Sequence, residues 1–157
     1  MVREKISVEN AGELITSDDI LGKEVIDAEG DFIGIAESVF INPKNLDFVG
    51  ISIDKGFLKK GLMIGKEYVK NITPYAVFLN VRPAYLLKGM DIFDIEGEKV
   101  GSVKELILRD NKNQIKKIIT SLGMLKKRIE IDAQFIKSIG ENVFLNVKKR
   151  EIIQLMR

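Results

Sequence analysis

The sequence predicts an all-β fold of two tandem small β-barrels, related by an internal repeat and packed as a pseudo-dimer. The stretch VFLNV at 77–81 recurs letter for letter at 143–147. Three glycines also recur 67 residues later: Gly22, Gly30 and Gly34 correspond to Gly89, Gly97 and Gly101. Turn signals separate short apolar stretches roughly every eight to twelve residues, which is typical of small barrels and sandwiches. A repeat of this kind fixes domain number and fold class before any local reading.

The repeat divides the chain into five parts. These are an N-terminal segment at 1–19, a first repeat at 20–81, a linker at 82–86, a second repeat at 87–147 and a basic C-terminal tail at 148–157. A domain of about 60 residues is marginal alone, so we expect the halves to pack together or self-associate. The linker is too short to be a flexible tether.

The first repeat begins with a short strand at 22–27 and a turn at 28–31, where Gly30 supplies a positive φ. Residues 32–41 form a strand that bends at Gly34. A turn at 42–45 leads to a partly alternating strand at 46–54. A glycine-bounded loop at 55–61, a strand at 62–64, a strand or single turn at 67–72 and a closing strand at 77–81 complete the repeat.

The second repeat follows the same order. We expect a turn at 94–98, a bent strand at 100–108, a polar turn at 109–113 and a strand at 114–120. A loop at 123–128 precedes an alternating strand at 129–132. Phe135, Ile136 and Ile139 take the places of Tyr68, Val69 and Ile72. Residues 151–157 have apolar residues at helical spacing, which favours a short terminal helix that packs on a barrel or frays. The alternative is an amphipathic contact with a membrane or a partner.

The composition argues against an enzyme. The chain has no cysteine and no histidine, which removes thiolate nucleophiles, zinc–thiolate sites and the commonest general base. Carboxylates cluster at two equivalent turns: Asp27, Glu29 and Asp31, and Asp94, Glu96 and Glu98. Calcium or magnesium is conceivable there, but calcium-loop spacing is absent and turn formation explains these residues equally well. We therefore predict no catalytic residue, no metal site and no cofactor.

Charge and hydropathy point to a cytoplasmic protein. No apolar run approaches the roughly 18 residues that span a bilayer, and the N-terminus lacks the apolar segment of a secretory signal. We expect recruitment to a membrane or division site only through partners. The net charge is +2, but the first 19 residues are acidic and the last ten are basic. These ends are solvated, contact each other, or each meet a partner.

Two equivalent loops place apolar residues beside paired cations. The candidate partner-binding residues are Phe57, Leu58, Lys59 and Lys60 in the first repeat and Met124, Leu125, Lys126, Lys127 and Arg128 in the second. Exposed apolar anchors with a basic rim suit a groove on a partner protein, and the same chemistry suits an anionic surface. In the alternative reading, the apolar side chains fold inward to cap each barrel and only the lysines face water.

These motifs together resemble the PRC-barrel family, which is named after the photosynthetic reaction-centre H subunit. The first copy is carried by Leu21-Gly22, Asp27-x-x-Gly30-x-x-x-Gly34, Gly56-Phe57-Leu58 and Val77-Phe78-Leu79. The second is carried by Gly89, Asp94-x-x-Gly97-x-x-x-Gly101, Gly123-Met124-Leu125 and Val143-Phe144-Leu145. The resemblance covers 20–81 and 87–147, nearly the whole chain.

The resemblance implies a non-catalytic interaction module. Family members include a cytoplasmic cap on a reaction centre and a domain of the RimM ribosome-maturation factor, and stand-alone archaeal members look like cell-division components. We therefore expect an adaptor or scaffold that binds protein partners, possible division proteins among them, and that self-associates without inserting into a membrane. The alternative is an RNA-processing or ribosome-maturation accessory factor. Near-neutral charge makes nucleic acid the less favoured partner.

Overall fold

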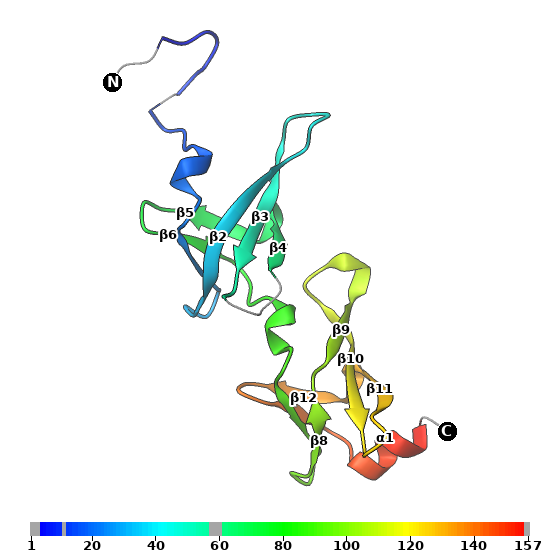
Figure 1. Ribbon diagram of the computed structural model, residues 1–157. Coiled ribbons are helices and arrows are strands. Elements are labelled where there is room, and N and C mark those ends of the chain that lie inside the picture. The colour runs from blue at the N-terminus through cyan, green and yellow to red at the C-terminus, as the bar shows by residue number, and fades with distance from the viewer. Residues whose placement is uncertain (1–3, 11, 57–60, 156–157) are drawn as a thin grey trace. The chain divides into compact units, whose positions relative to one another are not determined.

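The computed structural model describes residues 4–10, 12–56 and 61–155, and these residues are nearly all β, with 44% strand and one α-helix (Figure 1). The prediction of an all-β fold is therefore confirmed. The chain divides into two compact units, Met1–Arg82 and Pro83–Arg157. The packing of the two units as a pseudo-dimer stays a prediction.

The described part of the first unit is built around a six-stranded sheet in the order β4-β3-β2-β1-β6-β5. All neighbours are antiparallel except β1 and β6, which are parallel. The elements are η1 (Ser17–Asp19), β1 (Glu24–Ile26), β2 (Phe32–Ile41), β3 (Phe48–Asp54), β4 (Leu62–Gly65), η2 (Lys66–Tyr68), β5 (Val69–Ile72) and β6 (Ala76–Leu79), where η marks a 3-10 helix.

Connectivity forces this sheet to curl on itself. Its edge strands β4 and β5 are joined by η2 alone, which has three residues. That connection can separate the ends of the two strands by no more than about 14 Å. The edges of a flat six-stranded sheet would lie about 24 Å apart. The sheet must therefore bend until its edges approach each other, which is the geometry of a small barrel.

The second unit has the same strand order, divided between two sheets. One sheet has the order β11-β10-β9 and the other β12-β13-β7-β8, with β7 and β13 parallel. The elements are η3 (Ala84–Leu87), β7 (Asp91–Phe93), β8 (Lys99–Ser102), β9 (Glu105–Leu108), η4 (Arg109–Asn111), β10 (Ile115–Leu122), β11 (Lys127–Asp132), η5 (Ala133–Phe135), β12 (Ile136–Ile139), β13 (Val143–Leu145) and α1 (Lys149–Leu155). The links β8–β9 and β11–η5–β12 join the sheets at both ends.

The single bent strand predicted at 100–108 is instead two strands, β8 and β9. The chain changes hydrogen-bond partner between them: the N–H of Val103 donates to the carbonyl oxygen of Met90, whereas the N–H of Lys104 donates to that of Ile119. The predicted loop at 123–128 is also shorter than expected, because β11 already begins at Lys127. At 67–72 both alternatives occur, since η2 ends at Tyr68 and β5 follows.

Two equivalent glycines allow close strand contacts. A Cβ at Gly34 would collide with the backbone oxygen of Asp54 on β3. A Cβ at Gly101 would lie 2.5 Å from Oγ1 of Thr120 on β10. The repeated Asp-x-x-Gly-x-x-x-Gly pattern therefore ends on a glycine because the strands there leave no room for a side chain.

The terminal helix α1 belongs to the core of the second unit. Ile152 is only 3% exposed and joins a cluster of buried side chains that includes Ile118, Ile129 and Leu145. The next residue, Ile153, is 40% exposed. One face of α1 therefore packs on the barrel. None of the helices in the described ranges is long and apolar enough to cross a membrane.

Candidate interaction site on the second repeat

The tip of the β10–β11 hairpin is a tight four-residue turn. Leu122 and Lys127 are the last paired residues of the two strands. The N–H of Lys126 donates to the carbonyl oxygen of Gly123 over 3.1 Å. Gly123 and Lys126 both have positive φ, 70° and 48°. This geometry places the two remaining turn residues at the far end of the hairpin.

Those two residues, Met124 and Leu125, are 101% and 96% exposed. The alternative in which they fold inward to cap the barrel therefore does not hold for the second repeat. Large apolar side chains exposed at a hairpin tip lose contact with water only when a partner covers them. The equivalent candidates Phe57, Leu58, Lys59 and Lys60 lie outside the described residues.

Three cations follow this apolar tip in the chain. Lys126, Lys127 and Arg128 are all exposed. Arg128 lies 3.6 Å from the carboxylate of Glu130, and Lys117 lies 3.0 Å from the same group. The hydrogen bond and charge of Lys117, and then Arg128, lower the pKa of Glu130. Neither Lys126 nor Lys127 forms an ion pair with the described part of the chain, so both ammonium groups can meet a partner.

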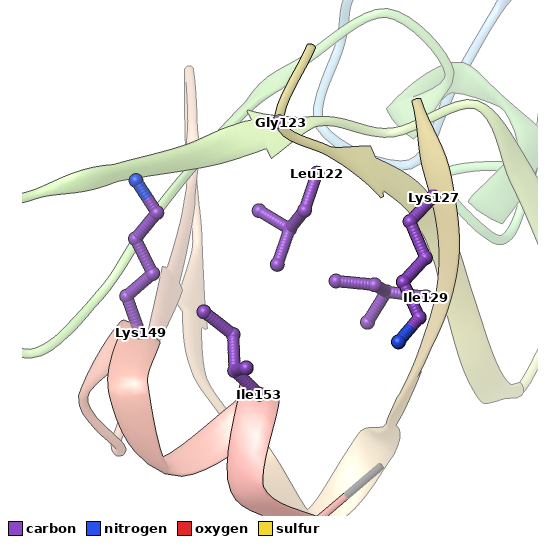
Figure 2. A pocket seen from close by; sticks show the side chains of 6 residues that line it. All are labelled: Leu122, Gly123, Lys127, Ile129, Lys149 and Ile153. Atoms are coloured by element: carbon purple, nitrogen blue, oxygen red, sulfur yellow. The ribbon is translucent and has the colours of Figure 1, made fainter. Parts of the chain in front are cut away.

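A pocket of about 280 Å³ lies between this hairpin and α1 (Figure 2). Its lining residues are Leu122, Gly123, Lys127, Ile129, Lys149 and Ile153. Figure 2 shows the side chains of Leu122, Ile129 and Ile153 pointing toward a common hollow, with the two lysines at its margin. The tip and the pocket therefore share the same hairpin. Sequence reasoning missed the pocket, because it depends on how α1 docks against β10 and β11.

The aspartates of the two carboxylate clusters stabilise their own turns by accepting backbone hydrogen bonds. Oδ1 of Asp27 accepts the N–H groups of Glu29 and Asp31, each over 2.9 Å. Oδ1 of Asp94 accepts the equivalent N–H groups, of Glu96 over 2.9 Å and Glu98 over 2.8 Å. Within the described ranges, no group of three acidic side chains is arranged to hold a metal ion.

The outer carboxylates of these turns form ion pairs with the residues that follow each closing strand. Arg82 lies 2.7 Å from Glu29 and 3.3 Å from Asp31. Lys148 and Lys149 lie 2.6 Å and 3.0 Å from Glu96 and Glu98. In both units, the residue after the repeated VFLNV stretch is thus a cation that forms an ion pair with a carboxylate of the first turn.

The two turns differ in one hydrogen bond. Oδ2 of Asp94 accepts the N–H of Lys149 at the start of α1 over 2.9 Å. This bond is the main cause of a lowered pKa of Asp94, and the N–H groups of the turn lower the pKa further. Desolvation of the carboxylate acts in the opposite direction. The residue at the position of Lys149 in the first repeat is Pro83, which has no N–H. Oδ2 of Asp27 accordingly has no hydrogen-bond partner among the described residues.

The sequence matches the model of one protein family. The profile of the PRC-barrel domain matches twice, at residues 12–76 and 79–152. No curated protein matches the sequence. PRC-barrel domains are generally interaction or scaffold modules, and the family is in general non-catalytic. With two copies of the domain covering most of its length, the chain belongs to the PRC-barrel family.

Proposed function

We propose that this protein is a non-catalytic adaptor or scaffold that binds protein partners through the tip of the β10–β11 hairpin. The observation that carries the proposal is the almost complete exposure of Met124 and Leu125. A structural role in the fold does not account for two large apolar side chains at a turn whose backbone needs neither of them. Burial in a partner groove would favour binding by about 1.5–3 kcal/mol for each side chain, before the costs of association.

The surrounding cations would orient this contact. Lys126 and Lys127 directly follow the apolar tip in the chain, and charges at the rim of an interface chiefly set the rate and specificity of association. The tip therefore combines an apolar anchor with a basic rim. We expect the groove that receives it to be apolar at its centre and acidic at its edge.

The proposal also includes the class of partner. On the resemblance to stand-alone archaeal members of the family, we propose components of the cell-division machinery. An RNA-processing or ribosome-maturation role is the alternative, and the cations around the tip favour it, because lysine and arginine also contact phosphates. The net charge of +2 makes broad phosphate binding the weaker reading.

The test is affinity purification from crosslinked native cells, read by mass spectrometry for the wild type and two double variants. Met124→Ser/Leu125→Ser removes the two apolar side chains of the tip. The control, Leu46→Ser/Met63→Ser, removes two side chains of the same types that are 76% and 70% exposed in the first unit. We expect division-ring proteins to be lost only with the tip variant. Recovery of ribosomal proteins that disappears on nuclease treatment would support the alternative. Equal recovery from all three proteins would contradict a role of the tip.

A further inference from the structure

We infer that the pocket between α1 and the β10–β11 hairpin receives a large apolar side chain from an acidic peptide segment of a partner. The inference rests on the proposed function, since it takes the same hairpin as the binding face, and it names the chemistry of the partner. The hairpin would then both insert its tip into a partner and accept a side chain from one.

The lining of the pocket favours an apolar occupant. Lys127 pairs with Leu122, and Ile129 follows two residues later on β11, so all three side chains lie on one face of the hairpin. Ile153 closes the opposite side from α1 (Figure 2). Because Ile153 stays 40% exposed although its neighbour Ile152 is buried, apolar surface remains for an incoming group.

The charge at the margin favours an anionic segment. Lys149 already pairs with Glu98, so it contributes mainly its aliphatic stem to the pocket. Lys127 has no ion-pair partner within the described ranges, and the exposed Lys126 is its neighbour in sequence. A carboxylate next to the buried side chain would meet these two ammonium groups. Cations around an apolar hollow thus complement an apolar residue flanked by aspartate or glutamate.

The small size of the pocket suits a single side chain. Its volume of about 280 Å³ is at the lower end of the roughly 300–1,000 Å³ of typical small-molecule sites. Its lining residues within the described ranges come from the hairpin and from α1 (Figure 2). One apolar anchor with charged neighbours on an extended segment fits this shape, whereas a cofactor would remain mostly exposed.

The test uses the full chain and three synthetic hexapeptides labelled with fluorescein. The probe has the sequence Glu-Asp-Leu-Phe-Asp-Glu, a second peptide replaces its apolar pair by two serines, and a third replaces its acids by the corresponding amides. Fluorescence polarisation gives affinity, and methyl NMR reports on Ile129 and Ile153, with buried Ile51 of the first unit as reference. We expect saturable binding of the probe only, with shifts confined to the pocket methyls.

Variants locate the site. Lys127→Glu should lower the affinity for the probe peptide about fivefold. Ile153→Asp should lower it about tenfold or more, because the substitution places a charge in the apolar hollow. Lys137→Glu, on exposed β12, reverses a charge outside the lining and should leave affinity unchanged. Thermal melting of each variant separates loss of binding from loss of folding.

Several results would overturn the inference. If the serine peptide bound with the same affinity as the probe, binding would depend on charge alone and not on an apolar side chain in the pocket. Binding to vesicles of equimolar phosphatidylcholine and phosphatidylglycerol, without binding of the probe, would assign the surface to a lipid headgroup instead. If the probe fails to bind while the tip variant still loses its cellular partners, the pocket inference falls and the proposed function stands. If the probe binds the pocket while the tip variant keeps its partners, the proposed function falls instead.

Discussion

Replacing Ile152 by alanine should destabilise the second unit strongly. The side chain is 3% exposed and packs in the core of that unit. The change removes three carbon atoms, worth about 0.8 kcal/mol each, or about 2.4 kcal/mol together. A cavity adds to this cost, although a terminal helix can settle partly into the space. We therefore expect the free energy of unfolding to fall by about 2–3 kcal/mol.

The neighbouring Ile153 provides a matched control. It has the same side chain, lies on the same helix and is 40% exposed at the open pocket. Its replacement by alanine removes fewer buried contacts and leaves no closed cavity. The expected loss is about 1 kcal/mol, at most half that of Ile152→Ala.

Urea unfolding followed by circular dichroism measures both variants, since the chain has no tryptophan to report by fluorescence. For a unit of this size, Ile152→Ala should lower Tm by about 10–20 °C. Hydrogen exchange by mass spectrometry should show faster exchange in the second unit and unchanged protection in the first. Equal losses for the two isoleucine variants would refute the packing of α1 described above.

Three further substitutions should change stability to different degrees. The pKa of Asp94 is lowered, chiefly by the N–H at the start of α1, so its charge stabilises the fold above its ordinary pKa of 3.8 and this stability is lost as pH falls through the lower folded value. Asp94→Asn should therefore reduce stability at neutral pH and flatten the acid side of a pH–Tm curve. Gly50→Ala places a Cβ against a backbone oxygen of β4 and should cost about 3 kcal/mol or more in urea unfolding, whereas Gly65→Ala at its register partner meets almost nothing and should be tolerated. Met124→Ser/Leu125→Ser should change the free energy of unfolding by no more than about 0.5 kcal/mol, because both side chains are exposed.

The fold could be predicted from the sequence largely because the pattern occurs twice. The first three residues of the recurring VFLNV stretch lie on β6 and β13, and the recurring Gly30 and Gly97 lie in the turns. Agreement between two copies separates a structural signal from chance. Strand propensity alone did not predict the division of β8 from β9, since that break is a change of hydrogen-bond partner at Val103 and Lys104.

The candidate site could be predicted only in part. The sequence identified the apolar-basic loop, but a run such as Met124-Leu125 is equally compatible with an inward cap and an exposed tip. Exposure is decided by the turn geometry at Gly123 and by the length of the hairpin. The pocket depends on contact between α1 and residues more than 20 positions earlier, such as Ile129. Such non-local packing leaves no local pattern in the sequence.

Site-specific photocrosslinking in native cells tests the central claim most directly. A benzophenone amino acid would replace Leu125 at the tip or, as control, Met63, which is 70% exposed on β4. The proposed function predicts discrete protein crosslinks from position 125, with tubulin-like division-ring proteins among them, that are absent from position 63. The same background at both positions, or crosslinks to RNA alone, would contradict it.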